Sequence, residues 1–192
     1  MWDSAFVVTH GGDMKINTIK RLYHGTDRAF QTFDFRKARG FKDFGKGFYL
    51  TSNFNQAQKW AQRKADTKQT AYIYCYELAT VKEADWKILE LLQYDKEWVD
   101  FISRSRIEGY ETDYDIIYDR IADNQYTKIA ETLQGYMARK SDVEAVIARI
   151  RWDNYNADQY CFKNERALAL LRNRTAIIQQ KDSDGRWMTV AR

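Results

Sequence analysis

The sequence predicts a single domain of the α+β class. Short apolar runs typical of β-strands, the clearest being AYIYCYEL at residues 71–78, alternate with segments whose apolar residues recur at the three- and four-residue spacing of a helix. No internal repeat and no low-complexity linker divides the 192 residues, and their 44% hydrophobic content is enough for a sizeable core. We therefore expect one domain over residues 14–192, preceded by an N-terminal extension or leader at residues 1–13.

The first strand expected in this domain carries a candidate site. The apolar run at residues 19–23 ends in His24, Gly25 and Thr26, which places an imidazole, a conformationally free residue and a hydroxyl at the end of a strand. The chain has two histidines, and the other one, His10, falls in the N-terminal extension. We therefore expect His24 to supply the imidazole of any site.

A second short strand is expected at residues 48–52, directly after Gly45-Lys46-Gly47. It has Tyr49 in its middle and the hydroxyl of Thr51 near its exit. This strand therefore offers an aromatic ring and a hydrogen-bonding group close to one another.

A helix is expected over residues 55–65, with Asn53 or Asn55 as its N-cap. The residues at helical spacing on its expected inward face are Phe54, Ala57, Trp60 and Ala61. This spacing predicts that Trp60 faces Tyr49 across a single cleft.

The polar loop between these strands, at residues 27–46, interleaves cations with aromatic rings. The cations are Arg28, Arg36, Lys37, Arg39, Lys42 and Lys46, and the rings are Phe30, Phe33, Phe35, Phe41 and Phe44. Such a loop is suited to the diphosphate and adenine of a dinucleotide, or to stacking on nucleic acid bases. An equally good interpretation is that the phenylalanines anchor the loop to the core while its charges are solvated. The run Asp43-Phe44-Gly45 does not indicate a kinase, because every other kinase feature is missing.

The remaining strands follow from short apolar runs bounded by polar residues. Core strands are expected at residues 71–78 and 158–163, and a strand followed by a polar turn is expected at residues 114–124. A last hairpin, formed by residues 174–180 and 187–190 around a turn at residues 182–185, is expected to close the sheet.

The remaining helices follow from helical spacing and from capping residues. The sequence predicts two helices over residues 85–106 hinged near Tyr94, one at residues 125–139, one opened by Ser141 with Glu144 as a capping box, and one at residues 165–171 capped by Asn164.

Charge and cysteine content narrow the class of protein. There are 31 Lys and Arg residues against 27 Asp and Glu, a net charge of +4 that permits an anionic partner without demonstrating one. Cys75 and Cys161 lie in apolar runs without metal-ligand spacing, so we expect free buried thiols and no metal site. No run approaches the ~20 apolar residues of a membrane helix, and no signal peptide is visible. A cytoplasmic protein without a membrane partner is therefore expected.

The motifs HGT at residues 24–26 and Gly-x-Gly-x-Tyr at residues 45–49 resemble those of the ADP-ribosyltransferase superfamily, in the branch that includes diphtheria toxin and the poly(ADP-ribose) polymerases. In the polymerases a second aromatic residue lies eleven positions after the tyrosine, and here that position is Trp60. The overall look is closest to an uncharacterised bacterial and phage family of that superfamily, with LYHGT, DFGKGFYLT and a later Gln-x-x-Phe strand, here at residues 159–162.

The resemblance implies a split β-sandwich of two small sheets with flanking helices, and an NAD cleft between the strands of His24 and Tyr49. It also implies a helical insertion at about residues 84–106, which in the superfamily often lies over the cleft and which here we expect to be packing. A run similar to Asp-x-Val-x-Gly-x-x-Ala-Asp is matched by Asp115 and Asp123, with Asp119 standing where the family has glycine.

The resemblance also implies roles for individual residues, with NAD as the co-substrate. Tyr49 and Trp60 would stack on nicotinamide, and the backbone of Gly25 would hold its carboxamide. His24 would hydrogen-bond the adenosine-side ribose. The expected catalytic residues are His24, Tyr49 and Gln159, and the expected NAD-binding residues are His24, Gly25, Thr26, Tyr49, Thr51 and Trp60.

Gln159 stands where the superfamily usually has glutamate, and we expect it to donate to the 2′-hydroxyl of the reacting ribose. Because an amide cannot accept a proton at neutral pH as a glutamate can, the case for chain elongation is weakened. The function expected from the resemblance is transfer of a single ADP-ribose to a macromolecular acceptor, which can be protein, RNA or DNA.

Such an enzyme would be a bacterial toxin or a phage-defence effector, with a cognate antitoxin as a further partner. Two alternatives remain open at this point. One is an NAD-binding module or an NAD glycohydrolase on the same fold, and the other is a non-enzymatic nucleic-acid-binding protein in which the loop binds and His24 is structural.

Overall fold

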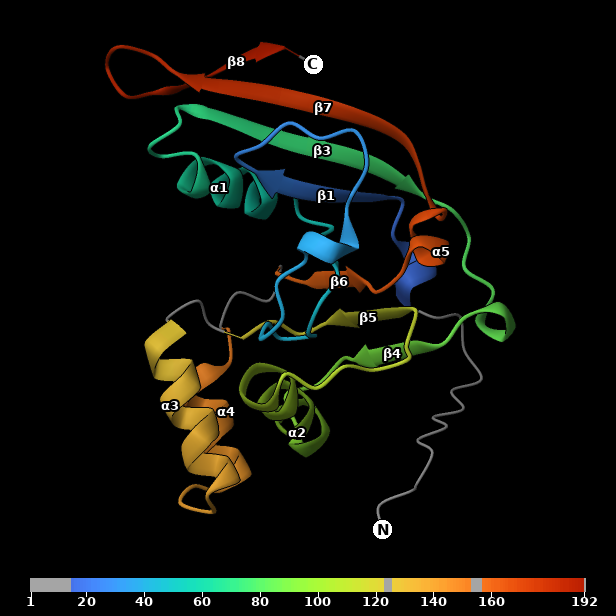
Figure 1. The fold of residues 1–192 in the computed structure, drawn as a ribbon, viewed down its shortest axis with the longest axis vertical. Coiled ribbons are helices and arrows are strands. Elements are labelled where there is room, and N and C mark those ends of the chain that lie inside the picture. Colours follow the sequence, from blue (N-terminus) through green and yellow to red (C-terminus); the bar gives the residue numbers. More distant parts are fainter. Residues whose placement is uncertain (1–14, 123–125, 153–156, 192) are drawn as a thin grey trace.

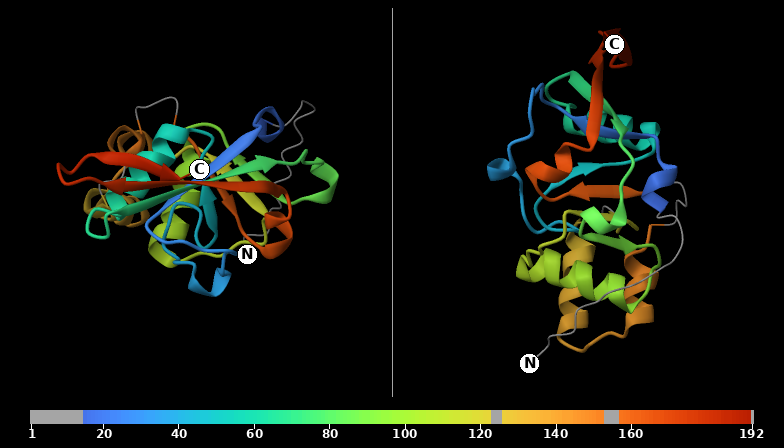
Figure 2. Two further views of the ribbon diagram at one scale, coloured as in Figure 1. Left: turned by 90° about the horizontal axis from the view of Figure 1, so that it is seen from above. Right: turned by 90° about the vertical axis from the view of Figure 1, so that its right-hand side faces the viewer.

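The computed structural model describes residues 15–122, 126–152 and 157–191, and it is built from two four-stranded sheets and a set of helices (Figure 1). The α+β class with two small sheets is thereby confirmed. The right-hand view of Figure 2 shows the layers from the side, with the first sheet above the second and with α2, α3 and α4 farthest from the C-terminal strand. The predicted extension at residues 1–13 and His10 lie outside the described residues.

The first sheet is antiparallel throughout. In spatial order it contains β1 (Arg21–Thr26), β3 (Thr70–Leu78), β7 (Leu171–Lys181) and β8 (Trp187–Ala191). The second sheet is mixed, because its last two strands are parallel. In spatial order it contains β2 (Phe48–Leu50), β6 (Gln159–Phe162), β5 (Ile116–Asp119) and β4 (Ile88–Leu91).

The α-helices are α1 (Phe54–Lys64), α2 (Lys96–Ser103), α3 (Tyr126–Met137), α4 (Val143–Ile150) and α5 (Glu165–Leu168). Three short 3-10 helices are η1 (Lys15–Thr18), η2 (Phe35–Lys37) and η3 (Glu83–Asp85), and a π-helical turn, η4 (Arg104–Glu108), follows α2.

Side-chain alternation along β2 separates two of the apolar cores. Phe48 and Leu50 point into the core between the two sheets, where they meet Tyr74 and Tyr76 of β3. Tyr49 points to the opposite face, which is covered by the helical layer. The site residues of β2 therefore lie on the face that turns away from the first sheet.

Helix α1 covers the outer face of β1 and β3. Asn53 is its N-cap and accepts a hydrogen bond from the backbone N–H of Gln56 at 3.1 Å, as one of the two predicted caps. Ala57 and Ala61 are buried, but Trp60 remains 39% exposed at the edge of the packed face. The prediction that Trp60 lies on the inward face of the helix is therefore wrong, because only small side chains fit where α1 approaches β1.

Two further predictions are wrong, each for a physical reason. Residues 85–106 form a strand, β4, and one helix, α2, instead of two helices, because Ile88–Leu91 pairs with β5. Helix α4 is capped by Asp142, which accepts from the backbone N–H of Ala145 at 2.7 Å, and not by Ser141. Helix α2 buries Trp98, as expected for an element that packs against the core.

The C-terminal hairpin and the thiols match the predictions more closely. The turn between β7 and β8 is closed by a hydrogen bond of 2.9 Å from the backbone N–H of Asp182 to the carbonyl of Arg186. Cys161 is a buried free thiol, and Cys75 is free but half-buried. None of the helices in the described residues combines the length and the apolar character needed to cross a bilayer.

Candidate functional site

The two sheets meet at one isolated antiparallel bridge between β1 and the end of β2. Tyr23 and Thr51 exchange two backbone hydrogen bonds there, of 2.8 and 2.9 Å. Continuing this register would place Gly25 opposite Tyr49, yet the two strands do not pair at that point and belong to separate sheets. The gap that opens between β1 and β2 next to this bridge is called the split below.

The imidazole of His24 maintains the split. Its Nδ1 lies 2.7 Å from the backbone carbonyl oxygen of Tyr49. Because a carbonyl only accepts, Nδ1 carries the proton and Nε2 is left as an acceptor. The ring packs against Phe48, with 4.6 Å between the ring centroids, and edge-on against Phe30. Burial lowers the pKa of His24 to about 4, opposed by the hydrogen bond to Tyr49 and helped by the charges of Lys64 and Lys42. The imidazole is therefore neutral at pH 7.

Gly25 directs its backbone polar groups into the split. Backbone direction alternates along a strand, so the N–H and C=O of Gly25 point to the same side as those of Tyr23, away from β3. The carbonyl that would continue the ladder, that of Tyr49, is already bonded to His24. Gly25 also has to be glycine, because a Cβ there would lie 2.0 Å from the carbonyl oxygen of Ala57 in α1.

The side chain of Tyr49 is fixed by its hydroxyl group. Its hydroxyl donates to the carbonyl of Gly45 at 2.7 Å and accepts from the N–H of Phe44 at 3.0 Å. The ammonium of Lys42 lies 4.7 Å from the ring centroid. Burial raises the pKa of the Tyr49 phenol well above its usual value, so the hydroxyl stays protonated and the ring is suited to stacking.

Trp60 has a different environment from Tyr49. Two cations of its own helix approach its exposed ring, the guanidinium of Arg63 at 4.3 Å and the ammonium of Lys64 at 5.1 Å from the centroid. The structure brings His24, Gly25 and Tyr49 together at the split. That Trp60 and Tyr49 enclose a nicotinamide ring between them stays a prediction.

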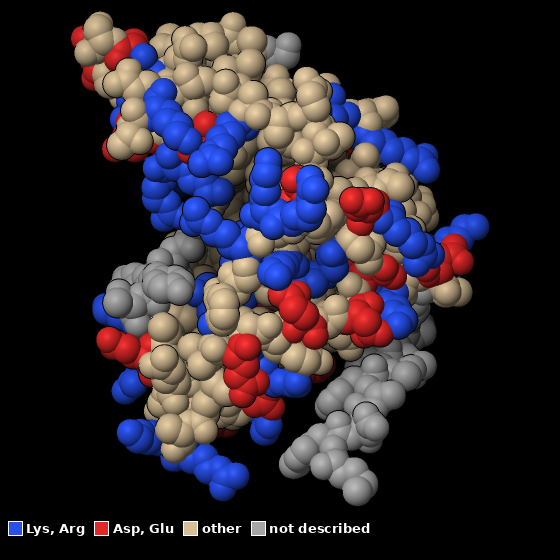
Figure 3. Space-filling model, viewed as in Figure 1, with Lys and Arg blue, Asp and Glu red and all other residues tan. Residues whose placement is uncertain are grey.

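A group of four cations lies beside these rings, and we call it the cationic rim. It consists of Arg39 and Lys42 from the loop and of Arg63 and Lys64 from α1. Burial, reinforced by repulsion from the other three cations and opposed by attraction to Asp27, lowers the pKa of Lys64 to about 8. None of the four forms an ion pair with the described residues. Figure 3 shows Lys and Arg side chains gathered around a hollow over α1 and the neighbouring loop.

Thr51 is predicted to bind NAD, but its hydroxyl is committed to a structural network. It donates to the carboxylate of Asp158 at 2.7 Å and accepts from the backbone N–H of Asn53 at 3.1 Å. Asp158 also accepts from the N–H of Ser52 at 2.8 Å. Thr26, the other predicted threonine, is nearly buried at the end of β1.

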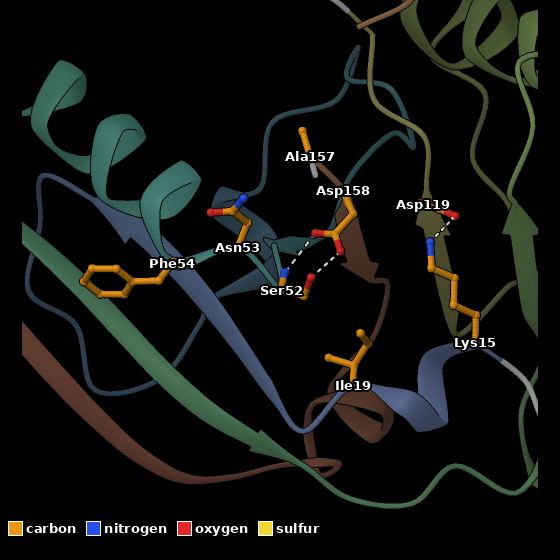
Figure 4. Close-up of a pocket in the computed structure, with 8 residues that line it drawn as sticks. All are labelled: Lys15, Ile19, Ser52, Asn53, Phe54, Asp119, Ala157 and Asp158. Atoms are coloured by element: carbon orange, nitrogen blue, oxygen red, sulfur yellow. Dashed lines mark hydrogen bonds and ion pairs between the residues drawn. The ribbon is translucent and has the colours of Figure 1, made fainter. Parts of the chain in front are cut away.

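The network of Asp158 borders a hollow of about 480 Å³ (Figure 4). Its lining residues are Lys15, Ile19, Ser52, Asn53, Phe54, Asp119, Ala157 and Asp158. In this view Lys15 and Asp119 form an ion pair on one side of the hollow, and Ser52 and Asp158 meet on the other. The lining includes none of the residues predicted to bind NAD, so this hollow is separate from the split.

Gln159 lies on the same face of its sheet as Tyr49, because the β2–β6 register places it beside Thr51. Its Nε2 donates to the carboxylate of Asp43 at 2.7 Å and lies 3.4 Å from the carbonyl of Arg120. A carboxylate can only accept, so the N–H₂ group of Gln159 points at Asp43. The sequence predicts donation from this amide to a ribose, whereas in the structure the donor is bound within the protein.

Asp43 is the residue of the site that the sequence reasoning misses. It comes from the loop, is 6% exposed, and forms an ion pair with Arg106 of η4. The residues around it, Lys42-Asp43-Phe44, show no helical or strand periodicity, and Asp43 has no side-chain partner close by in the sequence. The one signal available is an acidic residue among cations and phenylalanines in a segment already expected to bind.

Asp115 and Asp119 have different roles on β5. Asp115 accepts from the N–H of Lys87 at 2.9 Å and from Nδ2 of Asn164 at 2.7 Å, which ties two loops to the sheet. Asp119 has a φ of 114°, a conformation that favours glycine, so the position where the resembled family has glycine keeps a glycine-like backbone. Asp123 lies outside the described residues.

Comparison with known proteins gives a family for the chain. A family model described as "Protein of unknown function (DUF3990)" matches residues 20–173, which contain β1, the split and Gln159. No curated protein and no solved structure matches the chain. The match covers most of the sequence, and the chain therefore belongs to the DUF3990 family.

Proposed function

We propose that this protein transfers a single ADP-ribose from NAD to a macromolecular acceptor, on an ADP-ribosyltransferase-like split β-sandwich. The observation that carries the proposal is the split itself. The neutral imidazole of His24 donates a hydrogen bond to the carbonyl of Tyr49, so that this carbonyl does not pair with Gly25. The backbone N–H and C=O of Gly25 can therefore both bind a ligand. A primary carboxamide needs one acceptor and one donor side by side, and the nicotinamide of NAD carries such a group.

The reaction requires that one bond of the ribose breaks and another forms. The bond between C1′ and the ring nitrogen of nicotinamide breaks, and its electron pair leaves with a neutral nicotinamide. An oxygen or nitrogen of the acceptor bonds to C1′, and the proton of that group passes to solvent. Because the transition state is close to an oxocarbenium ion, the protein chiefly holds the reactants and stabilises positive charge.

The described residues supply what such a reaction needs. Tyr49, with its protonated phenol and fixed ring, offers a stacking surface for nicotinamide, and Trp60 is the candidate for the opposite face. Nε2 of His24 offers an acceptor to a ribose hydroxyl. The cationic rim attracts the diphosphate, since its four like charges lack ion pairs among the described residues.

A second candidate function, nucleic-acid binding without catalysis, is favoured by one specific observation. Phe41 of the loop is 54% exposed and is adjacent in sequence to Lys42 of the cationic rim. An exposed ring beside cations suits stacking on single-stranded bases. NAD binding separates the two functions, because the nucleic-acid-binding alternative requires none.

The test is to incubate the protein with NAD labelled in the adenosine part and with separate pools of cell protein, RNA and DNA. Nicotinamide release and label transfer are both followed for wild type, for Gln159→Ala and for a matched control, Gln180→Ala, whose side chain is exposed on β7. We expect transfer to one pool, and a loss of turnover of ~10²-fold in Gln159→Ala with little change in NAD affinity. Gln180→Ala should behave as wild type.

The outcomes separate the alternatives. Nicotinamide release without transfer to any pool would favour an NAD glycohydrolase. NAD binding without either product would favour an NAD-binding module. A protein that binds RNA or DNA but no NAD would refute the proposal in favour of the nucleic-acid-binding alternative.

A further inference from the structure

The buried carboxylate of Asp43 is held by side chains from distant parts of the chain. Arg106 of η4 forms an ion pair with Oδ1, and Gln159 of β6 donates to Oδ2 at 2.7 Å. Burying a charge is costly unless it is paired and hydrogen-bonded, and the ion pair with Arg106 and the hydrogen bond from Gln159 offset that cost for Asp43. The cluster joins the loop, the helical layer and the second sheet beside Tyr49.

The cluster determines which end of the Gln159 amide faces the site. Two acceptors, the carboxylate of Asp43 and the more distant carbonyl of Arg120, both lie on the Nε2 side. Turning the amide over would bring its oxygen against the carboxylate, an arrangement in which neither group can donate. The oxygen Oε1 is therefore directed away from Asp43.

The loop that carries Asp43 is itself attached to the aromatic residue of the site. Phe44 donates from its N–H to the hydroxyl of Tyr49 at 3.0 Å, and that hydroxyl donates to the carbonyl of Gly45 at 2.7 Å. Lys163 of the segment after β6 donates to the carbonyl of Phe44 at 2.6 Å. The position of Asp43 is thus coupled to the ring proposed to stack on nicotinamide.

We propose that Asp43 is a positioning residue that orients Gln159, so that Oε1 accepts a hydrogen bond from the 2′-hydroxyl of the reacting ribose. This inference rests on the proposed function. The chain from the hydroxyl through the amide to the carboxylate increases electron density on the ribose as positive charge develops, because linked hydrogen bonds polarise one another. Asp43 thereby places a carboxylate, itself paired with Arg106, behind the uncharged Gln159.

The most direct test is Gln159→Glu, which introduces the residue usual in the resembled superfamily. If Gln159 acted alone, this change would preserve or raise turnover. With Asp43 at hydrogen-bonding distance, two carboxylates cannot both be ionised, so they share a proton whose loss breaks the arrangement. We expect turnover by the variant to fall about tenfold per pH unit above the apparent pKa of the pair. The pH–rate profile of wild type should lack this falling limb.

A charge-swapped pair of variants completes the test. In Asp43→Asn, the new amide cannot accept from both Gln159 and Arg106, and we expect kcat to fall at least ~10-fold with KM for NAD nearly unchanged. The double variant Asp43→Asn/Gln159→Glu restores complementarity, because Asn can donate to Glu while its oxygen accepts from Arg106. Recovery of kcat in the double variant, without the pH limb, is the expected result.

Asp115→Asn is the matched control, since Asp115 is also a buried aspartate that accepts hydrogen bonds and pairs with an arginine, Arg166. It should lower stability as Asp43→Asn does while leaving kcat unchanged. The inference is overturned if Gln159→Glu is as active as wild type with a flat pH profile. It is equally overturned if Asp43→Asn, like Asp115→Asn, changes only stability.

Failure of the inference and failure of the proposed function are distinguishable. The side-chain N–H₂ resonances of Gln159, measured by NMR without NAD, should shift in Asp43→Asn more than in Asp115→Asn, because the carboxylate partner is lost. Absence of nicotinamide release by wild type would refute the proposed function and with it the role in turnover. Unshifted resonances in an active enzyme would refute only the inference that Asp43 orients Gln159, and the proposed function would stand.

Discussion

The two sides of the split are constructed differently. On the β1 side the polar groups that face the split belong to the backbone of Gly25, and the strand register with β3 fixes them. On the β2 and β6 side the candidate residues are the side chains of Tyr49 and Gln159, which are held by hydrogen bonds with a loop. The β1 side is therefore sensitive to substitutions that alter backbone packing, and the β2 and β6 side is sensitive to substitution of single side chains.

The largest expected effect is on the backbone side. In Gly25→Ala the added Cβ meets the carbonyl oxygen of Ala57 at 2.0 Å, a contact that no side-chain rotation relieves, so α1 must shift. We expect the free energy of unfolding to fall by about 4 kcal/mol and NAD binding to be lost. Urea denaturation and calorimetric titration measure both.

The matched control for this variant is Gly40→Ala, where the nearest atoms belong to the Lys46 side chain at 3.9 Å. It should unfold as wild type does. Wild-type stability in Gly25→Ala would contradict the close approach of α1 to β1.

His24 connects the two sides, and its titration gives the next largest effect. Its folded pKa of about 4 lies below the unfolded value of 6.5, so only the unfolded state binds a proton between these values. The contribution of neutral His24 to the free energy of unfolding is therefore fully present above pH 6.5 and is lost as the pH falls toward 4. The loss is about 2 kcal/mol, because the ring is partly exposed. The measurement is the difference in unfolding free energy between wild type and His24→Asn at pH 7 and at pH 5.

In that difference the contributions of the carboxylates cancel, because both proteins contain the same ones. A difference that is constant between pH 7 and pH 5 would show that His24 titrates normally and is not held neutral at the split.

The smallest expected effect is at the exposed ring. Trp60→Ala should weaken NAD binding by about 1 kcal/mol, the lower end of the range for a stacked base, because Trp60 is more exposed than Tyr49. Titration calorimetry with NAD measures it. Trp187→Ala is the control, since Lys181 also approaches that ring but β8 lies at the far edge of the first sheet. Equal NAD affinity in wild type and Trp60→Ala would remove Trp60 from the site.

The parts of the fold that follow local rules could be predicted from the sequence. The caps at Asn53 and Asn164, the strand expected at residues 71–78 and the final hairpin depend on neighbours in the chain, and the structure confirms them. The strand at Ile88–Leu91 could not be predicted, because its parallel partner lies almost thirty residues away and local spacing favours a helix. The position of Trp60 depended on how closely α1 approaches β1.

The candidate site, like the fold, could be predicted where it depends on residues close together in the sequence. His24, Gly25 and Tyr49 stand in short motifs, and the structure places them together. Asp43 could not be recognised, because its partners Arg106 and Gln159 lie 63 and 116 residues away. A charge network that spans the fold leaves no periodic pattern in the sequence.

The insertion of β6 between β2 and β5 has a consequence for the order of synthesis. A nascent chain completes β2 and β5 long before β6 leaves the ribosome, so both strands then expose edges of unpaired backbone N–H and C=O groups. Gln159 reaches Asp43 only when β6 joins them, because the two residues are 116 positions apart in the chain. Chains that stop before β6 therefore leave two strand edges unpaired, which favours aggregation, and they lack the Gln159 partner of Asp43.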